Sequence, residues 1–184
     1  MQHSSDPTDS GTDDDFKRYI QDVKDFPKEG IVFRDITPLL KDGAAFHRAV
    51  NKIASRFADE RIDLVCSVEA RGFILGAAIA HALGAGFVPV RKLGKLPRHC
   101  HQAQYNLEYG TDTLEIHQDA IAPGQRVLIV DDVLATGGTA EAVVNLVRKI
   151  KGEIVCVAVL IELRELKGRK KLAGVPSYSL MQYQ

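Results

Sequence analysis

One stretch of the sequence, VLIVDDVLATGGTAEAVVNLV at residues 127–147, constrains the fold more than any other. It opens with the apolar, β-branched run of residues 127–130, which is typical of a buried strand. After the turn ATGGT, apolar residues recur at the spacing of one helix face: Ala140, Val143, Val144 and Val147. A second apolar run follows at residues 154–163. A strand, a turn, a helix and a strand in this order predict parallel strands joined by a crossover helix.

The turn at residues 135–139 has the composition of an anion-binding turn. Gly137 and Gly138 allow the backbone to adopt positive φ and to approach a ligand closely. Free N–H groups and the dipole at the start of the following helix favour a phosphate, and the hydroxyls of Thr136 and Thr139 add donors. The stretch is neither a Walker A loop, because no Lys follows the glycines, nor a GxGxxG motif.

The acidic pair Asp131-Asp132 precedes this turn, although carboxylates repel a phosphate. Carboxylates accept hydrogen bonds from sugar hydroxyls and help to hold a hydrated Mg²⁺. We therefore expect a sugar phosphate whose phosphate binds the turn and whose ribose hydroxyls bind the two acids. The alternative is an ordinary strand-to-helix turn, but two acids and two threonines at this spacing argue against it.

VLIVDDVLATGGT closely resembles the phosphoribosyl pyrophosphate signature of the type I phosphoribosyltransferases. Further segments resemble blocks of the adenine-specific branch of that family, in the same order: FPKEGIVFRDITPLL (26–40), EARGF (69–73), VRKLGKLP (90–97), YNLEYGTDTLEIH (105–117), LKGRKKL and SYSLMQY. The resemblance covers residues 16–184. It implies that adenine and 5-phosphoribosyl 1-pyrophosphate are converted to AMP and pyrophosphate. It also implies Mg²⁺ that arrives mainly with phosphoribosyl pyrophosphate, and no metal site made by the protein alone.

The resemblance assigns roles to the residues at matching positions. The phosphoribosyl group would bind Asp131, Asp132, Ala135, Thr136, Gly137, Gly138 and Thr139. Pyrophosphate would bind Glu69, Ala70, Arg71, Arg91, Lys92 and Lys95. Adenine would bind Val32, Phe33 and Arg34, with Val133 and Leu163 as apolar walls. Glu108 and Tyr109 would lie over the reacting atoms, where a carboxyl group can exchange a proton with the purine. The family also implies a homodimer and a cis peptide bond between Glu69 and Ala70.

Several of these residues have ordinary alternatives. Arg71 could pair with Glu69 on the surface, the basic residues at 91–98 could form a solvated face, and Glu108 could be a plain cross-strand residue. A zinc site at residues 99–101 (His-Cys-His) is disfavoured, because a closed site needs four ligands and no second pair is present. Two functional rivals also remain, namely another purine substrate and a transcription regulator that only senses phosphoribosyl pyrophosphate. The FRD and LEYG blocks argue against the first. Only a short acidic stretch precedes the first expected helix, so no added DNA-binding domain is expected, which argues against the second.

We expect one α/β domain over residues 16–184, with a mostly parallel twisted sheet, helices on both faces and a small hood from the N- and C-terminal segments. The expected helices are residues 16–23, 46–57 and 72–83, and the expected strands are 62–68 and 86–92. Residues 26–43 are expected to be irregular, 93–104 a mobile loop, 105–117 a hairpin, and 168–171 a solvated helix face.

Composition narrows the function classes. Lys and Arg together number 24, as do Asp and Glu, so no basic footprint for nucleic acid or for an anionic membrane is expected. No apolar run approaches the roughly 20 residues of a membrane span. Residues 1–15 carry five Asp and no Lys or Arg, which predicts a disordered tail. Cys66 and Cys156 lie in apolar runs and are expected to be small buried hydrophobes, so a reducing cytoplasm is the expected location.

Overall fold

The computed structural model describes residues 14–106, 111–172 and 174–184. Its chain divides into two compact units, one that ends at Phe46 and one that begins at His47. Thirteen residues of the predicted acidic tail, 1–13, lie outside the described residues, and Asp14 and Asp15 belong to the first helix. Among the helices of the described residues, none is long and apolar enough to cross a membrane.

The first unit contains a two-stranded sheet. Helix α1 (Asp14–Lys17) is followed by β1 (Gln21–Lys24), which pairs antiparallel with β2 (Val32–Asp35). Helix α2 (Thr37–Lys41) comes next, and α3 (Gly43–Arg56) starts at the end of the unit. The turn between the strands contains Gly30 at φ 84°, whose N–H donates to Asp25 Oδ1 at 2.8 Å.

Two predictions for this unit are wrong. The helix expected over residues 16–23 ends at Lys17, because residues 21–24 instead find backbone partners in β2. The segment expected to be irregular, 26–43, contains both β2 and α2. Strands β1 and β2 form because each supplies backbone partners to the other, and local apolar spacing does not reveal such pairing.

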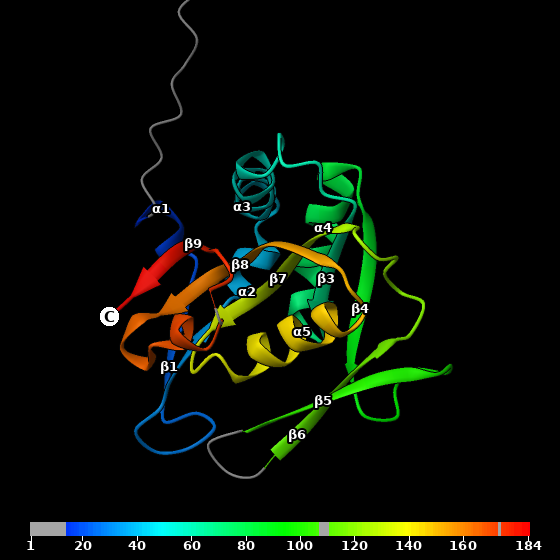
Figure 1. Ribbon diagram of the computed structural model, residues 1–184. Helices are drawn as coiled ribbons and strands as arrows, with labels where there is room; N and C mark the ends of the chain where they lie inside the picture. Colours follow the sequence, from blue (N-terminus) through cyan, green and yellow to red (C-terminus); the bar gives the residue numbers. More distant parts are fainter. Residues whose placement is uncertain (1–13, 107–110, 173) are drawn as a thin grey trace, which may run out of the picture. The chain divides into compact units, whose positions relative to one another are not determined.

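The second unit is built on a seven-stranded sheet of order β5-β6-β4-β3-β7-β8-β9. Its strands are β3 (Leu64–Val68), β4 (Gly86–Lys92), β5 (Cys100–Asn106), β6 (Thr111–His117), β7 (Arg126–Leu134), β8 (Glu153–Leu163) and β9 (Ser177–Tyr183). The neighbours from β4 to β9 pair in parallel, and β6 and β5 add an antiparallel edge. The mostly parallel α/β sheet is therefore confirmed (Figure 1).

The sheet has a topological switch point between β3 and β7. From β3 the chain passes through α4 (Arg71–Leu83) to β4 on one side, and from β7 it passes through α5 (Gly138–Lys149) to β8 on the other. Crossovers of the same right hand then place α4 and α5 on opposite faces, and Figure 1 shows α5 in front of the sheet. The carboxyl ends of β3 and β7 lie side by side at this point, where open α/β sheets bind their ligands.

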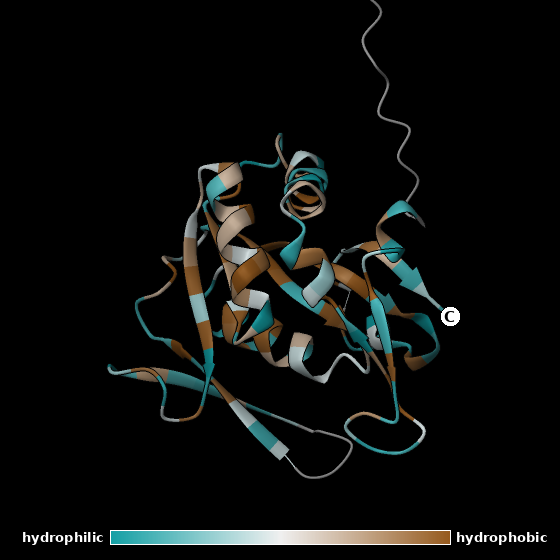
Figure 2. Cartoon of the chain, turned by 180° about the vertical axis from the view of Figure 1, so that it is seen from behind, coloured by the Kyte–Doolittle hydropathy of each residue, from teal (hydrophilic) through white to brown (hydrophobic). Residues whose placement is uncertain are grey.

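The core of this unit lies between the central strands and α5. Residues 127–130 of β7 are buried on both faces, since helices cover the sheet from both sides. Figure 2 shows the central strands mainly in the colours of apolar residues. Cys66 and Cys156 are buried as predicted, and burial raises the pKa of Cys66 to about 12 and that of Cys156 to about 11.

The sequence predicted three further segments of this unit only in part. The expected loop 93–104 ends at Cys100, where β5 begins, because β5 pairs with β6 along its whole length. The expected solvated face at 168–171 lies in the short 3₁₀ helix η2 (Gly168–Leu172), which follows η1 (Arg164–Leu166). Arg169, Lys170 and Lys171 are exposed as predicted, whereas Gly168 is buried. The C-terminal segment 177–183, expected to take part in a hood, is the edge strand β9 of the main sheet.

Candidate active site

Two strand-to-helix turns meet at the switch point. The first follows β3 at Glu69 and Ala70, and the second follows β7 at residues 135–137. A Cβ atom added to Gly72 would lie 2.7 Å from Asp131 Oδ1, so a side chain at this position would displace the Asp131 carboxylate. The two turns predicted to hold the two anionic ends of one ligand are therefore adjacent.

The Ser67 hydroxyl links α4 and β7 next to these two turns. Its side chain is fully buried in β3, where its hydroxyl contacts both the Gly72 carbonyl oxygen, at 3.0 Å, and the Val130 carbonyl oxygen. A hydroxyl has a single proton, so it donates to these two acceptors alternately or in a shared bond. The sequence analysis missed this residue, although a lone serine in an apolar strand was a usable signal.

The acidic pair lies inside β7 and not after it, which corrects the predicted end of this strand at residue 130. The ladder with β8 continues through Asp131, Val133 and Leu134, because each finds a backbone partner there. Asp131 is half-buried, whereas only 7% of Asp132 is exposed. Burial and the neighbouring Asp132 carboxylate raise the pKa of Asp131 well above its ordinary value.

Arg71 pairs with Asp132, an acid that the sequence analysis did not name as its partner. The Arg71 Nε lies 2.7 Å from Asp132 Oδ2. Glu69 instead accepts from Arg91 Nη2 at 3.0 Å and from the Lys92 backbone N–H at 2.7 Å. The hydrogen bond from Arg91 lowers the pKa of Glu69. The peptide bond between Glu69 and Ala70 is cis, as predicted.

The turn after β7 has the form of an anion site. Gly137 has φ 83°, a left-handed conformation that favours glycine, and no side chain caps the α5 N-terminus at this position. The first N–H groups of a helix have no intrahelical partner and favour a negative charge. Gly138 is buried behind them, while Thr136 is exposed and Thr139 is half-buried.

The hairpin of β5 and β6 reaches this turn. Strand β5 packs against α5, and the hydroxyl of the half-buried Tyr105 on β5 is 3.3 Å from Asp112 Oδ2. Asp112 also pairs with Lys92 Nζ at 3.1 Å, a link that the sequence analysis missed. The predicted catalytic residues Glu108 and Tyr109 lie outside the described residues.

Three other predicted residues, Lys95, Val133 and Leu163, lie in the second unit. Lys95 is exposed in the segment after β4, which the buried Glu115 holds by accepting from the Gly94 N–H at 2.8 Å. Val133 and Leu163, both half-buried, lie near the carboxyl ends of the paired strands β7 and β8.

The predicted adenine residues belong to β2 of the first unit: Val32, Phe33 and Arg34. Within that unit, the Phe33 ring packs edge-on against Phe26 with ring centroids 5.2 Å apart, and Arg34 pairs with Asp22. Val32 is 40% exposed, so its side chain is available to a ligand.

Within the described part of the chain, no group of three or more His, Cys, Asp or Glu side chains could hold a metal ion. The zinc alternative therefore gains no support, although Cys100 Sγ lies 3.6 Å from His117 Nδ1. Two adjacent carboxylates fit a different kind of metal binding. Mg²⁺ usually takes one or two carboxylates together with substrate oxygens and water.

Comparisons with known proteins identify the family. The phosphoribosyl transferase domain family matches residues 39–175. The chain belongs to the phosphoribosyltransferase family. An adenine phosphoribosyltransferase of Thermotoga sp. (strain RQ2) is 57% identical to this family member over 169 residues, which are 92% of this chain and 99% of that protein.

Solved structures agree with this family. The crystal structure of adenine phosphoribosyltransferase from Thermoanaerobacter pseudethanolicus superposes with a TM-score of 0.91 at 50% identity, covering 94% of this chain and 100% of that one. The Saccharomyces cerevisiae enzyme, complexed with an imino-altritol bisphosphate and adenine, superposes with a TM-score of 0.87 at 39% identity, covering 92% of this chain and 98% of that one.

Proposed function

We propose that this phosphoribosyltransferase transfers the phosphoribosyl group of 5-phosphoribosyl 1-pyrophosphate to adenine, giving AMP and pyrophosphate, a purine salvage reaction. The observation that carries the proposal is the pairing of an uncapped glycine turn with two carboxylates at the switch point of the sheet. The names of the similar enzymes from Thermotoga and Thermoanaerobacter support the choice of adenine.

The 5-phosphate of the substrate binds the turn of Ala135, Thr136, Gly137, Gly138 and Thr139 in this proposal. Backbone N–H groups and threonine hydroxyls donate to its oxygens. Asp131 and Asp132 accept hydrogen bonds from the ribose hydroxyls. As the bond from C1 to pyrophosphate breaks, positive charge develops on the sugar, and the nearby carboxylates stabilise it.

Pyrophosphate binds the turn of Glu69, Ala70 and Arg71 in this proposal. Arg71 exchanges its contact with Asp132 for phosphate oxygens, and its guanidinium suits two oxygens at once. Arg91, Lys92 and Lys95 add positive charge at the same edge. Mg²⁺ that arrives with the substrate would be held partly by Asp131 and Asp132, and it would neutralise the charge of the leaving pyrophosphate.

In the first unit, Val32, Phe33 and Arg34 are proposed to bind adenine. In the second unit, Val133 and Leu163 are proposed as apolar residues for the base. Phe33 offers a ring face for stacking, and the backbone of this β2 segment fixes the donor and acceptor pattern. A 6-oxo purine presents the opposite pattern at that edge, so it leaves buried polar groups unpaired. Glu108 and Tyr109 are proposed to cover the reacting atoms, where Glu108 exchanges a proton with the purine.

We also propose a cytoplasmic homodimer. The described cysteines are all free thiols, which fits a reducing compartment. Leu93 and Ile74 are 57% and 45% exposed, so a second copy would cover apolar surface next to the pyrophosphate residues. Light scattering on the purified protein tests this state, and a mass of one chain at all concentrations would contradict it.

A purine panel tests the proposed function. Purified protein, phosphoribosyl pyrophosphate and Mg²⁺ are mixed with adenine, hypoxanthine, guanine or xanthine, and the nucleotide formed is measured. AMP as the main product is the expected result. Product from a 6-oxo purine would contradict the adenine site, and binding of phosphoribosyl pyrophosphate without any product would favour a sensor.

A further inference from the structure

The phosphate-binding turn is packed, backbone against backbone, on the start of η2. A Cβ atom added to Gly137 would overlap the Gly168 carbonyl oxygen, and one added to Gly168 would overlap the Ala135 carbonyl oxygen. Real Cβ atoms do not occupy such positions, so the two segments interlock only because both residues are glycine. The position of Gly168 therefore fixes the position of the turn.

A second set of contacts fixes Gly168. The next residue, Arg169, donates from Nε to Glu162 Oε1 at 2.6 Å and from Nη2 to Glu162 Oε2 at 2.5 Å. Glu162 is 6% exposed, and it also accepts from Ser179 Oγ at 2.9 Å. A bidentate fork of this kind constrains both the distance and the orientation of its partners.

The Glu162–Arg169 pair lies beside the start of the phosphate-binding turn. Glu162 on β8 pairs in register with Leu134, the last residue of β7 before the turn. Lys167, which precedes Gly168 as Arg169 follows it, has φ 53°, which is uncommon for a residue with a side chain. The path of the chain through Gly168 is thus imposed by its surroundings and not by local preference.

We propose that Arg169 is a positioning residue for the phosphate-binding turn, acting through its fork on Glu162 and the backbone of Gly168. The inference rests on the proposed function for the identity of the ligand. It adds a residue outside the two ligand-binding turns and outside the residues predicted from the sequence to bind substrate. Its consequence is that affinity for phosphoribosyl pyrophosphate depends on a pair of side chains that do not contact it.

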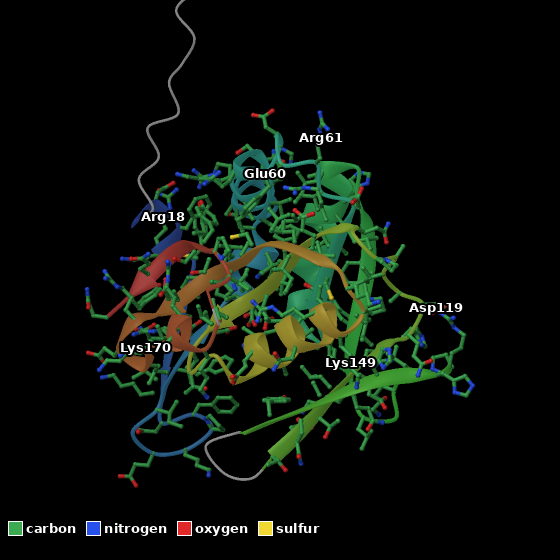
Figure 3. The ribbon with its side chains drawn as sticks, in the orientation of Figure 1. Arg18, Glu60, Arg61, Asp119, Lys149 and Lys170 are labelled. Atoms are coloured by element: carbon green, nitrogen blue, oxygen red, sulfur yellow. The ribbon has the colours of Figure 1, made fainter. Side chains whose placement is uncertain are left out.

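Arg169→Gln tests the proposal, with Lys170→Gln as its matched control. Lys170 lies on the same short helix and is exposed at the surface (Figure 3). Hydrogen exchange at residues 135–139 is measured by mass spectrometry, together with the KM for each substrate. We expect faster exchange at the turn and a KM for phosphoribosyl pyrophosphate that rises roughly ten- to a hundredfold in Arg169→Gln alone, with little change in the KM for adenine.

A role limited to general stability would give a different pattern, since it would lower the active fraction and leave both KM values unchanged. That pattern, or identical behaviour of Arg169→Gln and Lys170→Gln, would overturn the proposal. If Arg169→Gln does not fold, Arg169→Lys decides by the same readouts, because a lysine keeps the charge and loses the fork. An intermediate effect is expected, and wild-type behaviour would overturn the proposal. A wild-type protein that forms no AMP would refute the proposed function, whereas the exchange comparison would still decide the role of Arg169.

Discussion

At the scale of single residues, Asp131 is placed for binding at a cost in stability. Its carboxylate is half-buried beside Asp132, and both circumstances favour the protonated form in the folded protein. In the unfolded chain the same carboxyl group has its ordinary pKa of about 3.9. Folding therefore becomes less favourable as this group ionises, unless a ligand or cation compensates its charge.

The first prediction concerns Asp131→Asn in the absence of ligand. Because the folded pKa is raised, the two proteins should have equal stability below the unfolded pKa, where Asp131 is protonated in both states. As the pH rises toward and above the folded pKa, the variant should become more stable by about 0.5–2 kcal/mol. Urea unfolding between pH 4 and 8 measures the difference. A variant that is less stable than wild type at neutral pH would contradict this explanation.

Gly72→Ala is the second prediction. Alanine usually stabilises a helix more than glycine does, but here the new Cβ would lie 2.7 Å from Asp131 Oδ1. The Asp131 side chain is short and accepts from the Asp132 N–H, so it cannot move without losing that contact. We expect a loss of about 1–3 kcal/mol of stability together with weaker binding of phosphoribosyl pyrophosphate, measured by denaturation and calorimetry.

Gly43→Ala serves as the control for this change. A Cβ atom added at Gly43 meets no atom within 4 Å, and this glycine also lies in a helix. Its substitution should leave stability equal or slightly higher. Equal effects of the two substitutions would show that the contact with Asp131 is unimportant.

At the scale of elements, the sequence located helix α4 and strand β4 of the second unit well. Strand β4 has the predicted ends, and α4 begins one residue before the predicted start, since their apolar patterns and flanking glycines are local signals. Strand β1 and the extension of β7 through Leu134 could not be found in this way. Both exist because a distant strand supplies backbone partners, and local spacing carries no record of that pairing.

A third prediction concerns the Glu162–Arg169 pair that joins β8 to η2. The hydrogen bond from Arg169 lowers the pKa of Glu162. The pair therefore contributes its full stability above the ordinary glutamate pKa of about 4.3. This contribution is lost as the pH falls through the lower pKa of the folded state. Glu162→Gln should therefore be less stable than wild type at neutral pH, by about 1–3 kcal/mol for a hydrogen bond to a charged group. The difference should shrink in acid.

Denaturation of both proteins at pH 7 and near pH 3 measures this effect. Glu165→Gln is a suitable control, because Glu165 is exposed in the adjacent helix η1. A difference between wild type and Glu162→Gln that is the same at both pH values would show that the charge on Glu162 does not matter.

At the scale of the whole molecule, the order of the strands makes the site. Residues 69–71 and 131–139 are far apart in the sequence, and only the adjacency of β3 and β7 brings them together. The sequence predicted both turns from their composition and from the family resemblance. It did not predict which charges would pair, because Arg71 meets Asp132, and Arg91 meets Glu69, only when the sheet has formed.

The fourth prediction follows from this arrangement. Phosphoribosyl pyrophosphate should contact both turns, so it should stabilise the folded chain by mass action, by about 2.7 kcal/mol at one hundred times its dissociation constant. At the same concentration, ribose 5-phosphate should stabilise the folded chain less, since it lacks the pyrophosphate that binds Arg71. Thermal unfolding with each ligand measures the two effects. Equal stabilisation would mean that the turn after β3 does not take part.

The most direct test of the central claim is the rate of AMP formation by a variant with both Asp131→Asn and Asp132→Asn. The matched control is Asp59→Asn, which removes an exposed carboxylate before β3. If the acidic pair holds the ribose and stabilises the charge that develops on it, kcat/KM for phosphoribosyl pyrophosphate should fall about a hundredfold or more in the double variant and stay unchanged in the control. A double variant with the wild-type rate would contradict the assignment of this site.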